Sequence, residues 1–160
     1  MDTQLSRLAD ESITLELLVS ELYLLFHTTF PEDAPFWWRM VEEERNHAAL
    51  IRSAREYFAP LDRFPEKLVM QNISLIGETN KKLRILLETC SKKPPTRNEA
   101  LITALELETS AGELHFQHFI DEKNLSAVEK IFQQLNGHDS EHADRIRAYM
   151  ELNGLEKLGQ

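Results

Sequence analysis

Apolar residues recur every three or four positions over long stretches of the chain, which is the spacing that puts them on one face of an α-helix. These stretches predict five helices, over about residues 6–27, 36–58, 66–90, 96–121 and 126–152, the third irregular near Gly77. Every proline falls between two of these ranges, as expected of a residue that helix interiors exclude. Capping boxes, Thr96-x-x-Glu99 and Ser126-x-x-Glu129, open the last two. We therefore predict an all-α fold.

Carboxylates and histidines occupy several positions that this pattern assigns to the interior. In the second predicted helix, Glu44 lies in the middle of an apolar stripe, and His47 lies one step from it. Glu108 takes such a position in the fourth helix, and Asp139 and His142 do so in the fifth. The third helix has no interior carboxylate–histidine pair, so we expect it to be a crossover. In the fifth helix, the apolar spacing predicts that Leu135, and either Ile131 or Phe132, face the interior.

The two halves of the chain resemble each other in the order and spacing of these residues. Glu16, within Leu-Glu-Leu and five residues before a second glutamate, matches Glu108 in Leu-Glu-Thr. Glu44-x-x-His47 then matches Asp139-x-x-His142. Two linked matches in the same order favour an internal repeat of a helix pair.

The repeated residues have the chemistry of a metal centre. A carboxylate and a histidine three residues apart lie on one helix face and can reach the same ion. Two such helices, with one glutamate from each of two others, supply four carboxylates and two imidazoles, which is the di-iron arrangement of ferritin-like bundles. Four carboxylates balance two divalent cations. The six candidate ligands are Glu16, Glu44, His47, Glu108, Asp139 and His142.

LELLVSELY followed by EEERNH resembles the rubrerythrin/ferritin-like di-iron family, over most of residues 6–152. The resemblance implies an up-down four-helix bundle with a crossover helix. It implies two iron ions per chain, with manganese or a mixed pair as alternatives. Glu16 and Glu108 would be terminal carboxylate ligands, and Glu44 and Asp139 would bridge the two metals. His47 and His142 would each bind one metal. Tyr23 and His115 would hydrogen-bond to ligands or be ordinary core residues, and His138 is an additional candidate.

Three features depart from the family pattern. Asp139 is one methylene shorter than the glutamate expected there, so it bridges the metals only if its helix approaches closely. Ala111 replaces a glutamate that rubrerythrins use in peroxide turnover, which argues against that mechanism in its usual form. No rubredoxin module is present, so we expect the electron donor to be another protein.

Composition and charge narrow the class further. At 160 residues, a single domain over 1–160 is expected. A net charge of −9 argues against nucleic acid and anionic lipid as partners. The longest apolar run, Ile13 to Phe26, contains two glutamates and is shorter than the ~20 residues of a membrane span. One cysteine and no signal-peptide pattern indicate a cytoplasmic protein. The first helix is apolar on more than one face, which suggests a homodimer.

The function that these observations favour is a non-haem di-iron oxidoreductase that reduces hydrogen peroxide or dioxygen. An external donor such as a rubredoxin would supply the electrons. Ferritin-like iron oxidation for storage or transfer is one alternative. A helical interaction bundle that a metal stabilises is another.

Overall fold

The computed structural model describes residues 3–69, 72–110, 122–136 and 142–155. These residues form helices and connecting turns, with no strand among them, so the all-α prediction is confirmed. The α-helices are α1 (Thr3–Thr29), α2 (Ala34–Ser53), α3 (Ile73–Lys92), α4 (Arg97–Glu108), α6 (Ala127–Asn136) and α7 (His142–Leu152). A π-helical turn, η2 (Ala54–Phe58), continues α2, so the predicted helix over 36–58 is present.

The third helix begins later than predicted. Residues Glu66–Leu68 form a separate 3₁₀ turn, η4, and α3 begins after Asn72, whose side chain accepts a hydrogen bond from the Leu75 amide at 3.0 Å. An asparagine N-cap is a strong start signal that the apolar pattern alone does not show. Gly77 lies inside regular helix, so the predicted irregularity there is wrong.

The last two predicted helices are each shorter in the described residues. Both capping boxes are present at their starts. α4 ends at Glu108, where the Thr109 hydroxyl donates to the Leu105 carbonyl at 2.8 Å, and residues 111–121 lie outside the described part. The range 126–152 contains α6 and α7, with 137–141 outside the described part. Phe132 takes the buried position, while Ile131 and Leu135 are exposed, so an interior Leu135 was a wrong prediction.

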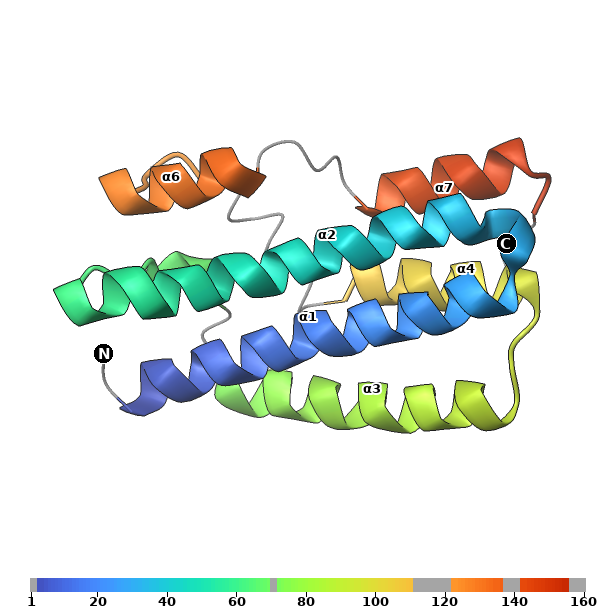
Figure 1. Cartoon of the computed structure of the whole chain (residues 1–160), viewed down its shortest axis with the longest axis horizontal. Helices are drawn as coiled ribbons and strands as arrows, with labels where there is room; N and C mark the ends of the chain where they lie inside the picture. Colours follow the sequence, from blue (N-terminus) through green and yellow to red (C-terminus); the bar gives the residue numbers. More distant parts are fainter. Residues whose placement is uncertain (1–2, 70–71, 111–121, 137–141, 156–160) are drawn as a thin grey trace.

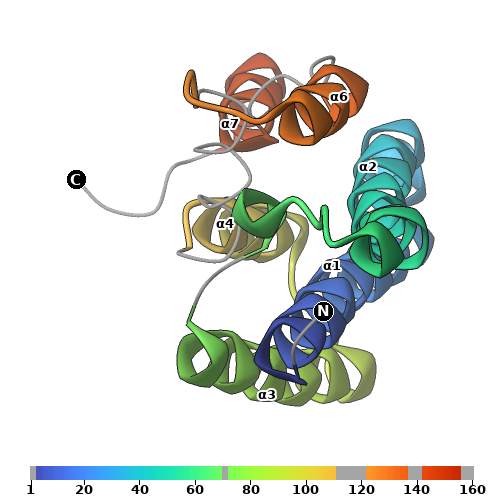
Figure 2. The same ribbon diagram turned by 90° about the vertical axis from the view of Figure 1, so that its left-hand side faces the viewer.

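The long helices run along one axis in alternating directions (Figure 1). α1 and α2 form an antiparallel pair, α3 packs along α1, and α4 packs against α7. In the end-on view of Figure 2, α1, α2, α4 and α7 surround a common centre, and α3 lies outside it. Along the chain, α3 lies between the α1–α2 pair and the α4–α7 pair, and its role as a crossover helix stays a prediction.

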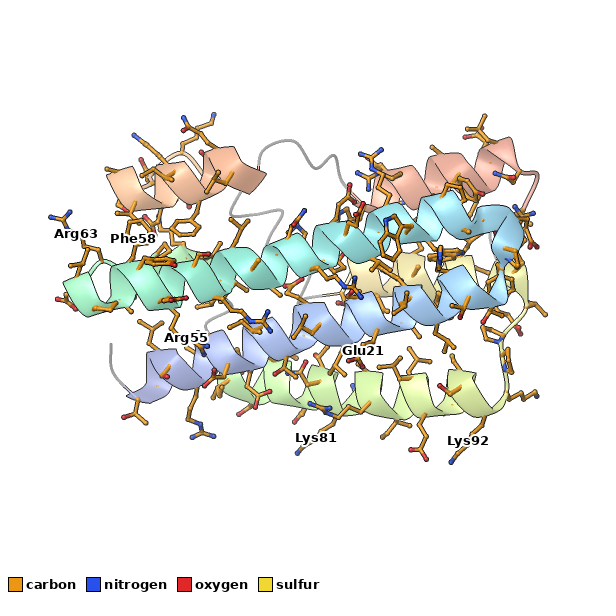
Figure 3. All side chains as sticks on the ribbon, in the orientation of Figure 1. Glu21, Arg55, Phe58, Arg63, Lys81 and Lys92 are labelled. Carbon is orange, nitrogen blue, oxygen red and sulfur yellow. The ribbon has the colours of Figure 1, made fainter. Side chains whose placement is uncertain are left out.

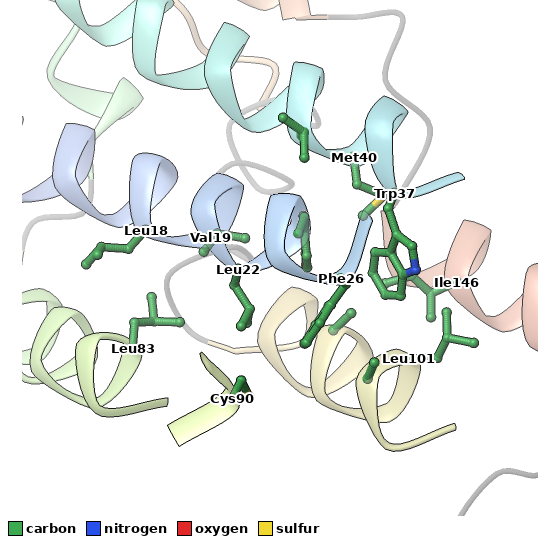
Figure 4. Close-up of a cluster of buried hydrophobic side chains, with 14 of the residues drawn as sticks. Leu18, Val19, Leu22, Phe26, Trp37, Met40, Leu83, Cys90, Leu101 and Ile146 are labelled. Carbon is green, nitrogen blue, oxygen red and sulfur yellow. The ribbon is translucent and has the colours of Figure 1, made fainter. Parts of the chain in front are cut away.

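Two apolar clusters fill the interior, one toward each end of α1. The larger includes Leu22, Phe26 and Trp37, and Figure 4 shows them together with Leu101 of α4. The smaller joins the first turns of α1 to the end of α2 and to Phe132 of α6. Between the clusters, α1 and α2 place buried polar residues instead of apolar ones. This polar layer is the candidate site.

α3 covers the second apolar face of α1. Leu83 of α3 lies in the same cluster as Leu18 of α1 (Figure 4), whereas Lys81 and Lys92 lie on the outer side of α3 (Figure 3). The feature that suggested a homodimer is therefore accounted for within one chain, and the homodimer stays a prediction that needs another surface.

A helix that spans a membrane has to be both long and strongly apolar. No single described helix is long and apolar enough, although the bent pair Thr3–Thr29 and Pro31–Leu61 meets the length and composition together.

A buried carboxylate ties three elements together at one end of the molecule. Asp33, in the turn between α1 and α2, is fully buried. Its two oxygens accept hydrogen bonds from Arg97 of α4 at 2.6 and 2.7 Å, and the Tyr149 hydroxyl of α7 donates to it at 2.6 Å. Burial opposes ionisation, but the bonds from Arg97 and Tyr149 prevail and hold the pKa of Asp33 below its usual value.

We predict that Asp33→Asn lowers the free energy of unfolding by about 1–3 kcal/mol at pH 7, because it leaves Arg97 without its charged partner. A carboxyl group with a lowered folded-state pKa stabilises the fold above its unfolded pKa, near 3.8 here, and loses that contribution as pH falls through the folded pKa. Urea unfolding of both proteins between pH 7 and pH 3 should show the difference shrinking below about pH 4.

The matched control is Asp144→Asn, since Asp144 pairs with Arg147 at 2.6 Å on the surface of α7. An exposed pair contributes about 0–1 kcal/mol, so this variant should change stability little. If the difference in free energy of unfolding between wild type and Asp33→Asn stayed constant down to pH 3, the lowered pKa of Asp33 would be contradicted.

Candidate metal centre

Four helices converge on one buried group of carboxylates and imidazoles. Glu16 comes from α1, Glu44 and His47 from α2, Glu108 from α4, and His142 from the first turn of α7. None of the five is more than 4% exposed. The residues that the repeat in the sequence paired, Glu16 with Glu108 and His47 with His142, thus lie in one layer.

Glu44 connects two halves of this group. Its Oε2 lies 3.2 Å from His47 Nδ1, and that nitrogen lies 3.5 Å from Glu16 Oε2. Its Oε1 lies 3.0 Å from His142 Nδ1, which in turn lies 3.1 Å from Glu108 Oε2. The arrangement is two carboxylate–histidine–carboxylate triads that share Glu44.

The spacing of the α2 residues explains how one helix serves both halves. Glu44 and His47 lie three residues apart, so they project from adjacent points of one face. The His47 and His142 rings stack with their centroids 5.5 Å apart and their planes 19° apart. Both rings turn Nδ1 toward Glu44. Each triad therefore has its own imidazole nitrogen and its own terminal glutamate.

Two further side chains orient the group from outside. The Tyr23 hydroxyl donates a hydrogen bond to Glu108 Oε1, as expected of a residue that lies two helical turns after Glu16 on the same face of α1. Glu43, which is also buried, lies 3.1 Å from His142 Nε2 and binds Arg145 and Arg39. With a cation on Nδ1, the remaining proton of the His142 ring would lie on Nε2, which faces Glu43.

Sequence reasoning missed Glu43. A signal was available, since Glu43 follows Met40 by three residues and precedes His47 by four, and this spacing places it on the interior face of α2. Of the three consecutive glutamates, only Glu44 lies in the middle of the apolar stripe, so the stripe predicts Glu44 alone as a ligand.

The pKa values show how the group balances its charge through protons. Burial raises the pKa of Glu16 to about 8, although His47 opposes the shift. Burial also raises the pKa of Glu108, helped by the negative charge of Glu44. For Glu44, burial acts upward as well, but His142 and His47 prevail and hold its pKa far below the usual range. Glu44 thus stays ionised between two carboxyl groups whose pKa values are raised.

The imidazoles supply the positive charge. Burial lowers the pKa of His47, but Glu16 and Glu44 outweigh it and raise that pKa to about 10. The pKa of His142 is likewise raised well above 6.5, by Glu44, Glu108 and Glu43 against the effect of burial. A divalent cation could take over the role of these protons.

The donor set fits such a cation. Ligand atoms of Glu16, Glu44 and His47 all lie within 4.8 Å of one another, and so do those of Glu44, Glu108 and His142. Within the described part of the chain, Glu16 Oε2 and Glu44 Oε1 are buried and have contacts of ion-pair length but no well-directed hydrogen bond. Carboxylate oxygen and imidazole nitrogen together suit iron, manganese and zinc.

Three predicted site residues, Asp139, His115 and His138, lie outside the described residues, as does Ala111. The structure therefore brings together five of the six candidate ligands. Whether Asp139 completes the second half stays a prediction.

The chain was compared with family models, curated proteins and solved structures, and none of them matches. The resemblance to rubrerythrins therefore stays an expectation from the sequence motifs.

We predict about two metal ions per chain, as in the di-metal bundles. His47→Ala and His142→Ala should each remove one of them. Glu44→Gln, which keeps the volume but replaces one shared oxygen by an amide nitrogen, should weaken both sites by at least about tenfold in Kd, or ~1.4 kcal/mol. Anaerobic titration with ferrous and manganous ions, followed by elemental analysis, measures both stoichiometry and affinity.

Glu42→Gln is the matched control, because Glu42 is exposed on the same helix and should leave both sites unchanged. Circular dichroism would establish that each variant keeps its helices. Tight binding of two ions by folded Glu44→Gln would rule out the shared carboxylate.

Proposed function

We propose that this chain is a ferritin-like, up-down four-helix bundle that holds two iron ions and reduces hydrogen peroxide or dioxygen. The supporting observation is the position of Glu44, whose two oxygens face two separate histidine–glutamate pairs. A single metal site would need one such pair. Manganese or a mixed pair would fit the same donors.

The surroundings of the group support redox chemistry more than a structural metal. Two ferrous ions held here would supply the two electrons that cleave an O–O bond. Glu44 would hold its position while the outer carboxylates, Glu16 and Glu108, adjust to changes in charge. Tyr23 donates a hydrogen bond to Glu108 from a fully buried position, so a phenol lies directly beside the proposed iron ligands.

Electrons have to reach this group from another protein. All five described residues of the group are buried, so a donor such as a rubredoxin would dock on the outer surface. A cytoplasmic location, on the grounds of the single cysteine, and a homodimer through a surface other than the apolar face of α1 complete the proposal.

The proposal predicts that the diferrous protein is oxidised in one rapid phase by hydrogen peroxide, and more slowly by dioxygen. Continued turnover should require an added reductase and rubredoxin, because the sequence shows no rubredoxin motif. Stopped-flow absorption after anaerobic loading with iron measures both rates. Glu44→Gln, loaded in the same way, should lose the rapid phase.

Faster oxidation by dioxygen would contradict the peroxide preference and favour an oxidase. A protein that binds two ferrous ions and is oxidised by neither reagent would contradict the oxidoreductase proposal and favour a metal-stabilised interaction bundle. A large iron-filled shell in light scattering would favour storage.

A further inference from the structure

We propose that Trp37 relays oxidising equivalents between Tyr23, beside the metal centre, and Tyr149, at the end of the molecule. The purpose of the relay rests on the function proposed above, but the transfer itself does not require a metal. The relay joins the carboxylate group to the buried Asp33 that ties α4 and α7 to the first turn.

Aromatic rings form an unbroken row between the two tyrosines. The Tyr23 and Trp37 centroids lie 5.7 Å apart, and Phe36 lies 5.1 Å from Trp37. Phe36 then stacks on Tyr149 at 4.1 Å with an interplanar angle of 21°. Tyr23 and Trp37 are fully buried, and Tyr149 is only partly so. Short steps between rings favour electron transfer, and the row ends where solvent or a donor can reach it.

Each tyrosine has a carboxylate that can accept its proton. Tyr23 donates to Glu108 Oε1, and Tyr149 donates to Asp33 Oδ1 at 2.6 Å. Oxidation of a phenol in a protein interior requires such an acceptor, because the phenoxyl radical forms with loss of the hydroxyl proton. Arg97 keeps Asp33 ionised and ready to take it.

Trp37 differs from the tyrosines in a way that suits a relay. Its Nε1 is buried and has no hydrogen-bond partner among the described residues. An oxidised Trp37 therefore has no base within the described part of the chain to take its proton, and it remains a strongly oxidising radical cation. The Trp37 radical cation therefore takes an electron from a neighbouring tyrosine and does not persist.

Each transfer moves one electron, and each tyrosine loses or regains one proton with it. A one-electron oxidant removes an electron from Tyr23, whose hydroxyl proton moves to Glu108. Trp37 reduces the Tyr23 radical, the proton returns from Glu108, and Trp37 becomes a radical cation. Tyr149 then reduces Trp37 across Phe36 and gives its proton to Asp33. These steps bring an electron from Tyr149 inward to Tyr23, and the reverse order carries an electron from Tyr23 outward to Tyr149.

The surrounding rings make this route specific. Phe26 also touches Trp37, with centroids 5.0 Å apart (Figure 4), but it leads to Phe30 and to no phenol. The sequence contains two tryptophans and three tyrosines, and the two outside the row, Trp38 and Tyr57, are exposed. Replacing both by phenylalanine leaves Trp37, Tyr23 and Tyr149 as the only residues of these types.

The test uses the full chain with Trp38→Phe and Tyr57→Phe, without metal, so that failure of the metal centre cannot affect it. Ultraviolet laser photoionisation creates the radical on Trp37 whatever its burial. Nitrous oxide converts the ejected electron to a hydroxyl radical, and tert-butanol removes that radical before it attacks the protein. Transient absorption then follows the conversion of the tryptophan radical to a tyrosyl radical. We expect this conversion at a rate independent of protein concentration, and slower in D₂O.

Variants separate the two arms. With Tyr23→Phe added, transfer should continue to Tyr149, and with Tyr149→Phe added, it should continue to Tyr23. In the Tyr23→Phe protein, Phe36→Leu should slow transfer by about tenfold or more, equal to ~1.4 kcal/mol on the barrier. Phe26→Leu, the matched control beside the same indole, should leave the rate unchanged.

No tyrosyl radical in the Tyr23→Phe protein would overturn the outer arm, and none in the Tyr149→Phe protein would overturn the inner arm. Equal slowing by Phe36→Leu and Phe26→Leu would overturn the path. If Phe36→Leu does not fold, the two conservative tyrosine variants and the solvent isotope effect still decide the proposal. A working relay in a protein that binds no metal would leave the relay intact and remove the proposed function.

Discussion

The structure depends on one buried carboxylate that faces two imidazoles. Glu44 is fully buried in the middle of α2 and contacts His47 on one side and His142 on the other. An unpaired charge in this position would be strongly unfavourable, so α2 and α7 each bring an imidazole to it. α1 and α4 then bring a second carboxylate to each imidazole. Helix packing and charge balance are therefore one constraint here, which is why α4 and α7 have to meet α1 and α2 at this level.

The position of the two apolar clusters follows from that constraint. Each cluster lies to one side of the polar layer, so the layer is shielded from water at both ends of the bundle axis. Low dielectric strengthens the attraction between Glu44 and the imidazoles, and it equally penalises any carboxylate left alone. Protons on Glu16 and the histidines satisfy this balance without metal, and two cations would satisfy it with fewer protons.

Much of this arrangement could be predicted from periodicity and repetition. The i, i+3 pair of Glu44 and His47, and the match of Glu16 with Glu108, were sufficient to identify residues that come together from four helices. Glu43 was missed because its role depends on His142, a partner 99 positions away whose ring orientation no local pattern reveals. Leu135 was misplaced because α6 has apolar residues on its exposed side as well, so that periodicity alone does not tell which face is covered. The role of α3 on the outer face of α1 is likewise a matter of tertiary packing.

The end of the bundle and its centre are linked by the same residues that pack the core. Trp37 fills the space between α1 and α4, yet its ring also lies in the row that leads from Tyr23 to Tyr149. Packing alone would be served by any large apolar side chain. An indole in this place leaves a buried N–H that finds no partner among the residues that the structure describes, which has a cost. That cost is explained if the position needs a ring that can lose an electron and cannot lose its proton. The buried pair of Asp33 and Arg97 then serves two purposes, since it fastens three elements together and provides the base for the last step.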